Sequence, residues 1–179
     1  PPTPLPPKHS ADENAAISRA QVQIDDVLAK LAASSDLEEL DSPDHFVKMY
    51  AVPVTGYQTK VVSGIATTVV DATIEQCASD EILVSRSVLK RHYADGGKEI
   101  QTKKMSNHTH IYRRARDLGV KGLRVREWIT KVTWKRVDKD TIVIAYEDCN
   151  GDANLGITPN KEYVRGSSST YMRLARKEE

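Results

Sequence analysis

The sequence predicts an α+β fold in which one long helix precedes a mainly antiparallel sheet. Apolar side chains recur at helical spacing near the N-terminus, whereas β-branched and alternating runs separated by turn residues follow after Tyr57. Strand and helix patterns do not alternate regularly, as they would in a parallel sheet with crossover helices. The chain has 179 residues, of which 39% are apolar, and this size suits one domain with a tail.

The long helix is expected over residues 11–33. Ser10 and Glu13 have the spacing of a capping box, in which each side chain bonds the backbone amide of the other residue. The apolar residues that follow fall on one helical stripe: Ile17, Ile24, Val27, Leu28 and Leu31. This stripe requires a partner surface, either in the same domain or on another chain.

Residues 1–7 form a proline-rich segment with two PxxP spacings, which excludes a helix there. Such a segment is typical of an interdomain linker, and binding to an SH3 or WW domain is the alternative. We therefore expect a linker over residues 1–10, an amphipathic helical region over residues 11–40 and the main domain over residues 41–179.

The main domain is expected to pair successive strands in antiparallel fashion. A helix over residues 74–83 begins after the N-cap candidate Thr73, with Gln76 three residues later. Turn residues divide the β-type runs into expected strands over residues 59–70, 88–93, 98–105, 109–118, 126–136, 141–147 and 163–175.

Alternation within two neighbouring strands predicts an aromatic and aliphatic wall. Trp128, Val132 and Trp134 share one strand face, and Ile144 and Tyr146 share a face of the partner strand. Such a wall is either one side of a solid core or the lining of a ligand cavity in a curved sheet.

Short motifs in the second half resemble those of a known family. They are Arg126-Glu127-Trp128-Ile129, then Trp134, and later Val164-Arg165. The first is similar to the Arg-Asp-Phe-Val motif of the START domain, the StAR-related lipid-transfer module, and the last to its late Val-Arg pair. The order of the patterns over about residues 59–176 is similar as well.

This resemblance implies a helix-grip fold, in which a curved antiparallel sheet surrounds a hydrophobic cavity and an N-terminal helix packs beside it. It further implies non-enzymatic binding or transfer of one sterol, phospholipid or similar lipid, without a cofactor. A closing C-terminal lid helix belongs to the family plan, but the sequence ends at Glu179, so this helix is either cut away or encoded beyond the segment. The approximate positions of the buried acid and arginine of sterol-binding members hold Arg113 and Val132, so sterol specificity does not carry over.

The resemblance and the alternation together give a set of candidate lipid-binding residues: Arg126, Trp128, Trp134, Tyr146, Arg165 and Met172. The two arginines have a structural alternative, because strand arginines often pair with a nearby carboxylate such as Glu127 or Asp148. No catalytic residue is assigned.

Charge is strongly segregated, since residues 86–139 hold 16 Lys and Arg against 5 Asp and Glu. This segment is expected to face either an anionic membrane or the acidic N-terminal third of the chain. The basic residues expected to face a membrane are Lys103, Lys104, Arg113 and Arg114. Nucleic acid is not expected, because few aromatic residues interleave with these charges.

Two other functions remain open at this point. One is a metal-assisted enzyme using His108, His110 and Asp148, although their spacing matches no familiar ligand motif. The other is a protein interaction module without a cavity. Because Cys77 and Cys149 lack a CxxC partner and no signal or spanning segment is evident, we expect a cytoplasmic protein that binds membranes peripherally.

Overall fold

The computed structural model of the chain describes residues 8–33, 37–53, 62–149 and 155–177. The proline-rich segment 1–7, for which an SH3 or WW partner was considered, lies outside these ranges. The elements follow in the order α1 (Ala11–Ala33), β1 (Glu38–Leu40), β2 (Val47–Pro53), β3 (Val62–Thr68), α2 (Ile74–Ile82), α3 (Arg86–Ala94), β4 (Gly97–Lys104), β5 (Thr109–Arg116), β6 (Arg126–Asp138), β7 (Thr141–Asp148), β8 (Val164–Arg165) and β9 (Thr170–Ala175). This order confirms the predicted α+β plan.

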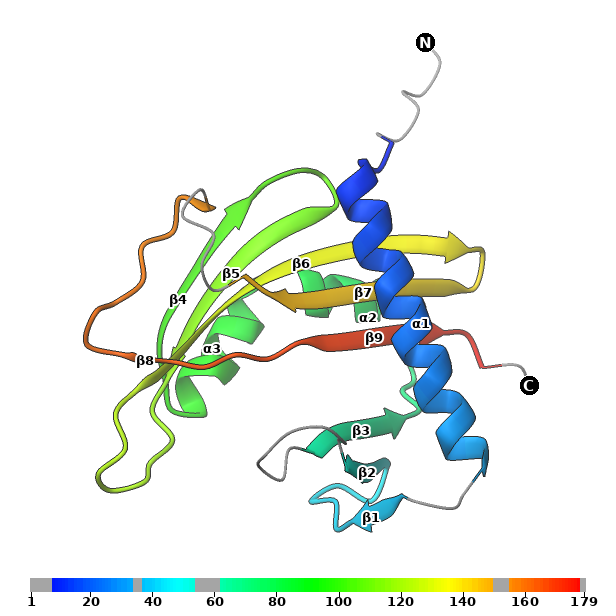
Figure 1. Cartoon of the computed structure of the whole chain (residues 1–179), viewed down its shortest axis with the longest axis horizontal. Coiled ribbons are helices and arrows are strands. Elements are labelled where there is room, and N and C mark those ends of the chain that lie inside the picture. The colour runs from blue at the N-terminus through cyan, green and yellow to red at the C-terminus, as the bar shows by residue number, and fades with distance from the viewer. Residues whose placement is uncertain (1–7, 34–36, 54–61, 150–154, 178–179) are drawn as a thin grey trace.

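The main sheet has the strand order β4-β5-β6-β7-β9 (Figure 1). Its outer strands β4 and β9 do not pair with each other, so the sheet is not closed into a barrel. β8 pairs with β6 in parallel, which corrects the expectation that every neighbour is antiparallel. The single strand expected over residues 163–175 is divided into β8 and β9. A second sheet contains β1, β2 and β3.

α1 begins at the predicted capping box. The Ser10 amide donates to Glu13 Oε2 at 2.7 Å, and the Glu13 amide donates to Ser10 Oγ at 3.2 Å. The helix ends at Ala33, so the helical region is shorter than the expected 11–40, and Glu38–Leu40 is a strand instead. Ile17 and Ala20 are buried against β7, which supplies the partner surface that the apolar stripe required.

α2 also begins as predicted, because Thr73 and Gln76 form a complete capping box. The expected strand over residues 88–93 is wrong, since these residues belong to α3. Ser85 caps this helix by accepting a hydrogen bond from the Val88 amide at 3.3 Å. The half-buried residues Val88, Leu89 and His92 have helical spacing, and this spacing prevails over the strand propensity of the segment.

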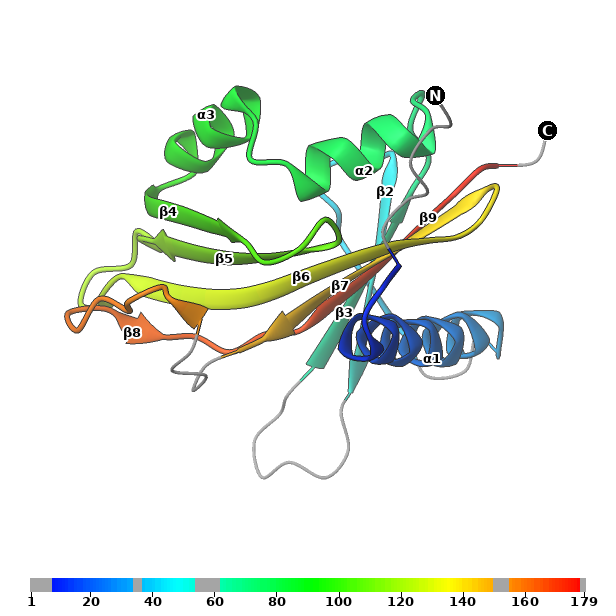
Figure 2. The ribbon, with the colours of Figure 1, turned by 90° about the horizontal axis from the view of Figure 1, so that it is seen from above.

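The helices cover opposite faces of the main sheet (Figure 2): α2 and α3 lie on one side and α1 on the other. On the α2 side, a buried cluster contains Ile74, Ala78, Ile82, Tyr112, Val132, Ile142 and Ile144. The predicted wall lies on this face, because Trp134, Tyr146 and Met172 pack against the same cluster.

Among the described helices, none is long and apolar enough to cross a membrane. Within the described residues, Cys77 and Cys149 are not joined by a disulfide.

Candidate ligand-binding cavity under α2 and α3

A cavity of about 320 Å³ lies between the two helices and strands β4 and β5. Its walls combine a few aliphatic side chains with many charged ones: Asp80, Glu81, Leu83, Val84, Val88, Arg91, His92, Asp95, Ile100, Arg114 and Arg116. Small-molecule sites typically occupy about 300–1,000 Å³ and place a few polar groups among apolar walls. The cavity therefore has the size of a small-molecule site, with more charged side chains in its lining than is typical.

Arg114 enters the cavity from β5. Strand alternation places it on the same face as Tyr112, and the register pairs it with Ile100 of β4, another lining residue. Its guanidinium carbon lies 5.2 Å from the centroid of the Tyr112 ring. Within the described residues, Arg114 Nε is buried without a hydrogen-bond partner. The strand thus presents a cation to the cavity, and within the described residues no ion pair joins it to a carboxylate.

His92 approaches the cavity from α3, on the side of β4. Its ring packs over Gly97, where a Cβ atom would come within 2.3 Å of His92 Nε2, so no larger residue fits at that position without movement. Burial lowers the pKa of His92, which keeps the ring neutral near neutral pH. In the described part of the chain, its Nε2 atom is also buried and has no partner.

Four other charged side chains of the lining have hydrogen-bond or ion-pair partners: Asp80, Glu81, Arg91 and Arg116. Arg91 pairs with Asp80 at 3.0 Å. Arg116 Nε donates to the Asp95 carbonyl at 2.8 Å, while the carboxylate of Glu81 accepts from Tyr146 Oη at 3.0 Å. Burial, followed by the nearby Glu81 charge, raises the pKa of Tyr146, so its hydroxyl remains a donor. Within the described residues, Arg114 Nε and His92 Nε2 lack such a partner.

The tryptophan, tyrosine and methionine candidates lie on the cavity side of the sheet. Trp134, Tyr146 and Met172 pack beneath α2, beside the cavity rather than in its lining. Trp128 shares their strand face and packs against Gly166, where a Cβ atom would come within 2.3 Å of the indole nitrogen. Arg126 occupies the same face at the start of β6 and is half-buried.

Arg165 points to the opposite face, which corrects its assignment to the lipid-binding set. It is the register partner of Glu127, and its Nε lies 3.6 Å from Glu127 Oε1. The carboxylate pairing that was the structural alternative for Arg165 is therefore confirmed. Glu127 is fully buried and also binds Arg113 at 2.5 Å, and Arg113 in turn binds Glu99 at 2.6 Å. This network fixes β8 to β5 and β4.

The basic residues expected to face a membrane are mostly used inside the molecule. Arg113 is 2% exposed in the network with Glu127, so its assignment is wrong, and Arg114 lines the cavity. Lys103 Nζ donates to the Leu155 carbonyl at 3.0 Å, whereas Lys104 is exposed. Arg116, at the end of the same strand, is exposed, so the arginines of β5 do not share one environment.

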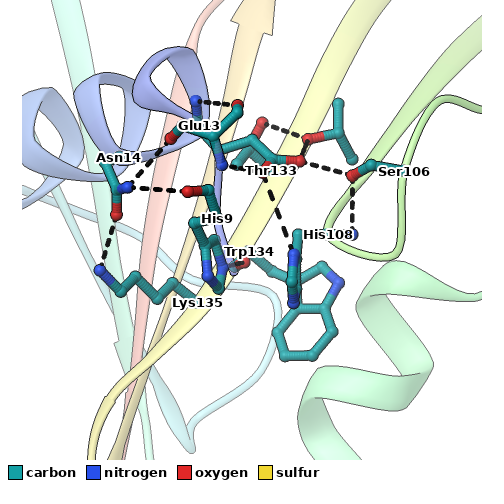
Figure 3. A network of polar contacts seen from close by, with 10 residues as sticks. His9, Glu13, Asn14, Ser106, His108, Thr133, Trp134 and Lys135 are labelled. Carbon is teal, nitrogen blue, oxygen red and sulfur yellow. Dashed lines mark hydrogen bonds and ion pairs between the residues drawn. The ribbon is translucent and has the colours of Figure 1, made fainter. Parts of the chain in front are cut away.

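The residues proposed for a metal site do not come together. His108 is buried, stacks on His9 with ring centroids 3.7 Å apart and lies 4.0 Å from Glu13 Oε2 (Figure 3). Asp148 accepts a hydrogen bond from Ser167 in a different part of the molecule. Among the described residues, no group of three or more His, Cys, Asp or Glu side chains is arranged to hold a metal ion.

Sequence reasoning missed the α3 side of the cavity. His92 and Val88 were assigned to a strand, so their position above β4 and β5 was not expected. The available signal was Ser85, a good N-cap residue, followed by apolar residues at helical spacing.

Comparison with solved structures identifies the architecture. The human StAR-related lipid transfer protein 5 superposes with a TM-score of 0.60 at 12% identity, over 90% of this chain and 81% of that chain. The chain has the fold of a START domain. A StAR-related lipid transfer protein from Xanthomonas axonopodis gives a TM-score of 0.62 at 11% identity, over 80% and 75% of the two chains. The lipid transfer and protein localization domain of human StarD13 gives 0.53 at 12% identity, over 88% and 84%. No protein-family model and no curated protein sequence matches the chain.

Proposed function

We propose that this START-fold chain binds a lipid in the cavity under α2 and α3 and transfers it between membranes without chemical change. The observation that carries this proposal is a 320 Å³ cavity in a fold shared with lipid transfer proteins. Removal of the apolar chain from water supplies the affinity, and the polar lining orients the head of the ligand. Trp128, Trp134, Tyr146 and Met172 lie on the same face of the sheet, beside the lining of this cavity.

Transfer requires contact with a membrane, and the connection between β5 and β6 is suited to it. This loop, residues 117–125, directly follows the cavity residue Arg116 and projects beyond the sheet (Figure 1). Its apolar side chains Leu118, Val120 and Leu123 are 46%, 54% and 45% exposed. Lys121 and Arg124 are exposed between and beside them. Apolar side chains enter a bilayer interface, while neighbouring cations favour anionic lipids.

The first test combines binding and transfer. The chain purified from eukaryotic cells is analysed by native mass spectrometry and organic extraction, and transfer of a fluorescent phosphatidylcholine is followed between vesicles. A co-purifying lipid at near one-to-one stoichiometry is expected, together with transfer above the rate without protein. Absence of both lipid and transfer would favour the protein interaction module instead.

A cavity-filling variant tests the location of the ligand. Val88 is half-buried in the cavity wall, so Val88→Trp places an indole in the space assigned to the lipid. Transfer is expected to fall at least about tenfold, because a ligand that loses roughly 1.4 kcal/mol binds tenfold more weakly. Val69→Trp is the matched control, since Val69 is 65% exposed outside the cavity. Equal transfer by the two variants would contradict this location.

A further inference from the structure

We propose that the cavity selects lipids with an anionic headgroup, phosphate or carboxylate, which Arg114 binds. This inference rests on the proposed lipid-binding function and specifies the class of ligand. It is derived from the unpartnered polar atoms of the protein rather than from its fold.

Unpartnered nitrogens are concentrated on one face of the molecule. In the described part of the chain, three buried side-chain nitrogens have no hydrogen-bond partner: Arg114 Nε, His92 Nε2 and His110 Nδ1. Arg114 and His92 line the cavity, and His110 lies on the same face of β5, four residues before Arg114. Two of these side chains, Arg114 and His92, therefore line the same cavity, and Arg114 is the cation of the two.

The chemistry of these groups restricts what a ligand at this cavity can be. A buried polar group without a partner costs free energy, so native proteins satisfy nearly all of them with protein, water or ligand. Arginine has donors only, in a planar fork that matches the oxygens of a carboxylate or phosphate. A neutral lipid with one hydroxyl cannot balance the positive charge of Arg114.

The charges around the cavity are compatible with an anion. Asp80 is paired with Arg91, and the Glu81 carboxylate accepts from Tyr146. Within the described residues, no ion pair joins Arg114 to a carboxylate, although Asp95 and these two acids belong to the same lining. Lys104, the register partner of His110, adds a further positive charge at this face.

The test compares two lipids that differ only in the phosphate. Binding of oleoyl lysophosphatidic acid and of monooleoylglycerol is measured by titration calorimetry with the full chain, and inorganic phosphate is titrated separately. The wild-type protein is expected to bind the phosphate-bearing lipid at least about tenfold more tightly, the factor that charge-assisted hydrogen bonds supply.

Arg114→Met is expected to abolish this preference by weakening binding of the phosphate-bearing lipid at least about tenfold. Because the change removes an unpartnered buried charge, the lipid-free variant is expected to melt at the same temperature as the wild type or higher. This melting temperature separates loss of the site from loss of the fold. Arg86→Gln is the matched control on exposed α3 surface, and it is expected to retain the preference.

Each other outcome overturns the inference. Equal affinity of the wild type for the two lipids would refute the anionic headgroup while leaving lipid binding intact. Binding of neither lipid would refute the proposed function as well. Inorganic phosphate bound as tightly as the phosphate-bearing lipid would show a site for free anions instead of headgroups.

Discussion

Glu13 provides a quantitative test of how α1 is held on the sheet. Its carboxylate is only 6% exposed and accepts hydrogen bonds from Ser106 Oγ at 2.5 Å and Thr109 Oγ1 at 2.9 Å (Figure 3). It also accepts from the Ser10 amide in the capping box. One charged group therefore links the start of α1 to the turn between β4 and β5. Glu13→Gln removes the charge and keeps the shape.

The magnitude follows from the pKa of this carboxyl group. Burial alone would raise the pKa of Glu13, but hydrogen bonds from Ser106, Ser10 and Thr109 outweigh it, and the pKa falls from 4.5 to about 2. A shift of this size corresponds to about 3 kcal/mol of stability. Because the folded-state pKa is lowered, this stability is fully present above pH 4.5 and is lost as the pH falls toward about 2.

The assay is urea unfolding of the wild type and Glu13→Gln at about pH 7 and about pH 3. At neutral pH, the variant is expected to be less stable by roughly 2–3 kcal/mol. The difference is expected to shrink at about pH 3, because this pH lies below the ordinary pKa of 4.5 and unfolding of the wild type is then coupled to proton uptake by Glu13. Glu162→Gln, at an exposed site, is the control and should change stability by less than about 0.5 kcal/mol. A difference that is equal at the two pH values would refute the reasoning.

Two other predictions concern the buried ion network and the projecting loop. Arg113→Met leaves Glu127 buried without its main partner, so the free energy of unfolding in urea should fall by about 3–5 kcal/mol, and Glu127→Leu added to it should recover much of that loss. Equal losses in the single and double variants would contradict the role of an unpaired charge. Leu118→Asp combined with Leu123→Asp should weaken sedimentation with anionic vesicles at least about tenfold, because two apolar side chains no longer leave water. Unchanged sedimentation would show that the loop does not enter the membrane.

Local signals in the sequence predicted the helix starts and the strand faces. Both capping boxes, Ser10 with Glu13 and Thr73 with Gln76, form as expected, because the groups that interact lie within four residues of each other. Alternation likewise placed Val132 and Trp134 on one face of β6. These features depend on neighbours in the chain and not on the rest of the fold.

Competing local preferences explain the errors in the elements. Residues 88–93 contain enough strand-favouring side chains to be read as a strand, but they form α3, whose cap at Ser85 and position over β4 decide the outcome. Similarly, β8 and β9 were expected as one strand. They are separate because β8 pairs with β6, whereas β9 pairs with β7.

The adjacent residues Arg113 and Arg114 show what the sequence by itself determined and what the tertiary structure decided. Alternation along β5 determined that their side chains point to opposite faces of the sheet. Only the fold decided that Arg113 meets Glu99 and Glu127 while Arg114 enters the cavity beneath α3. The environment of a charge depends on partners distant in the chain, and a count of basic residues carries no information about them.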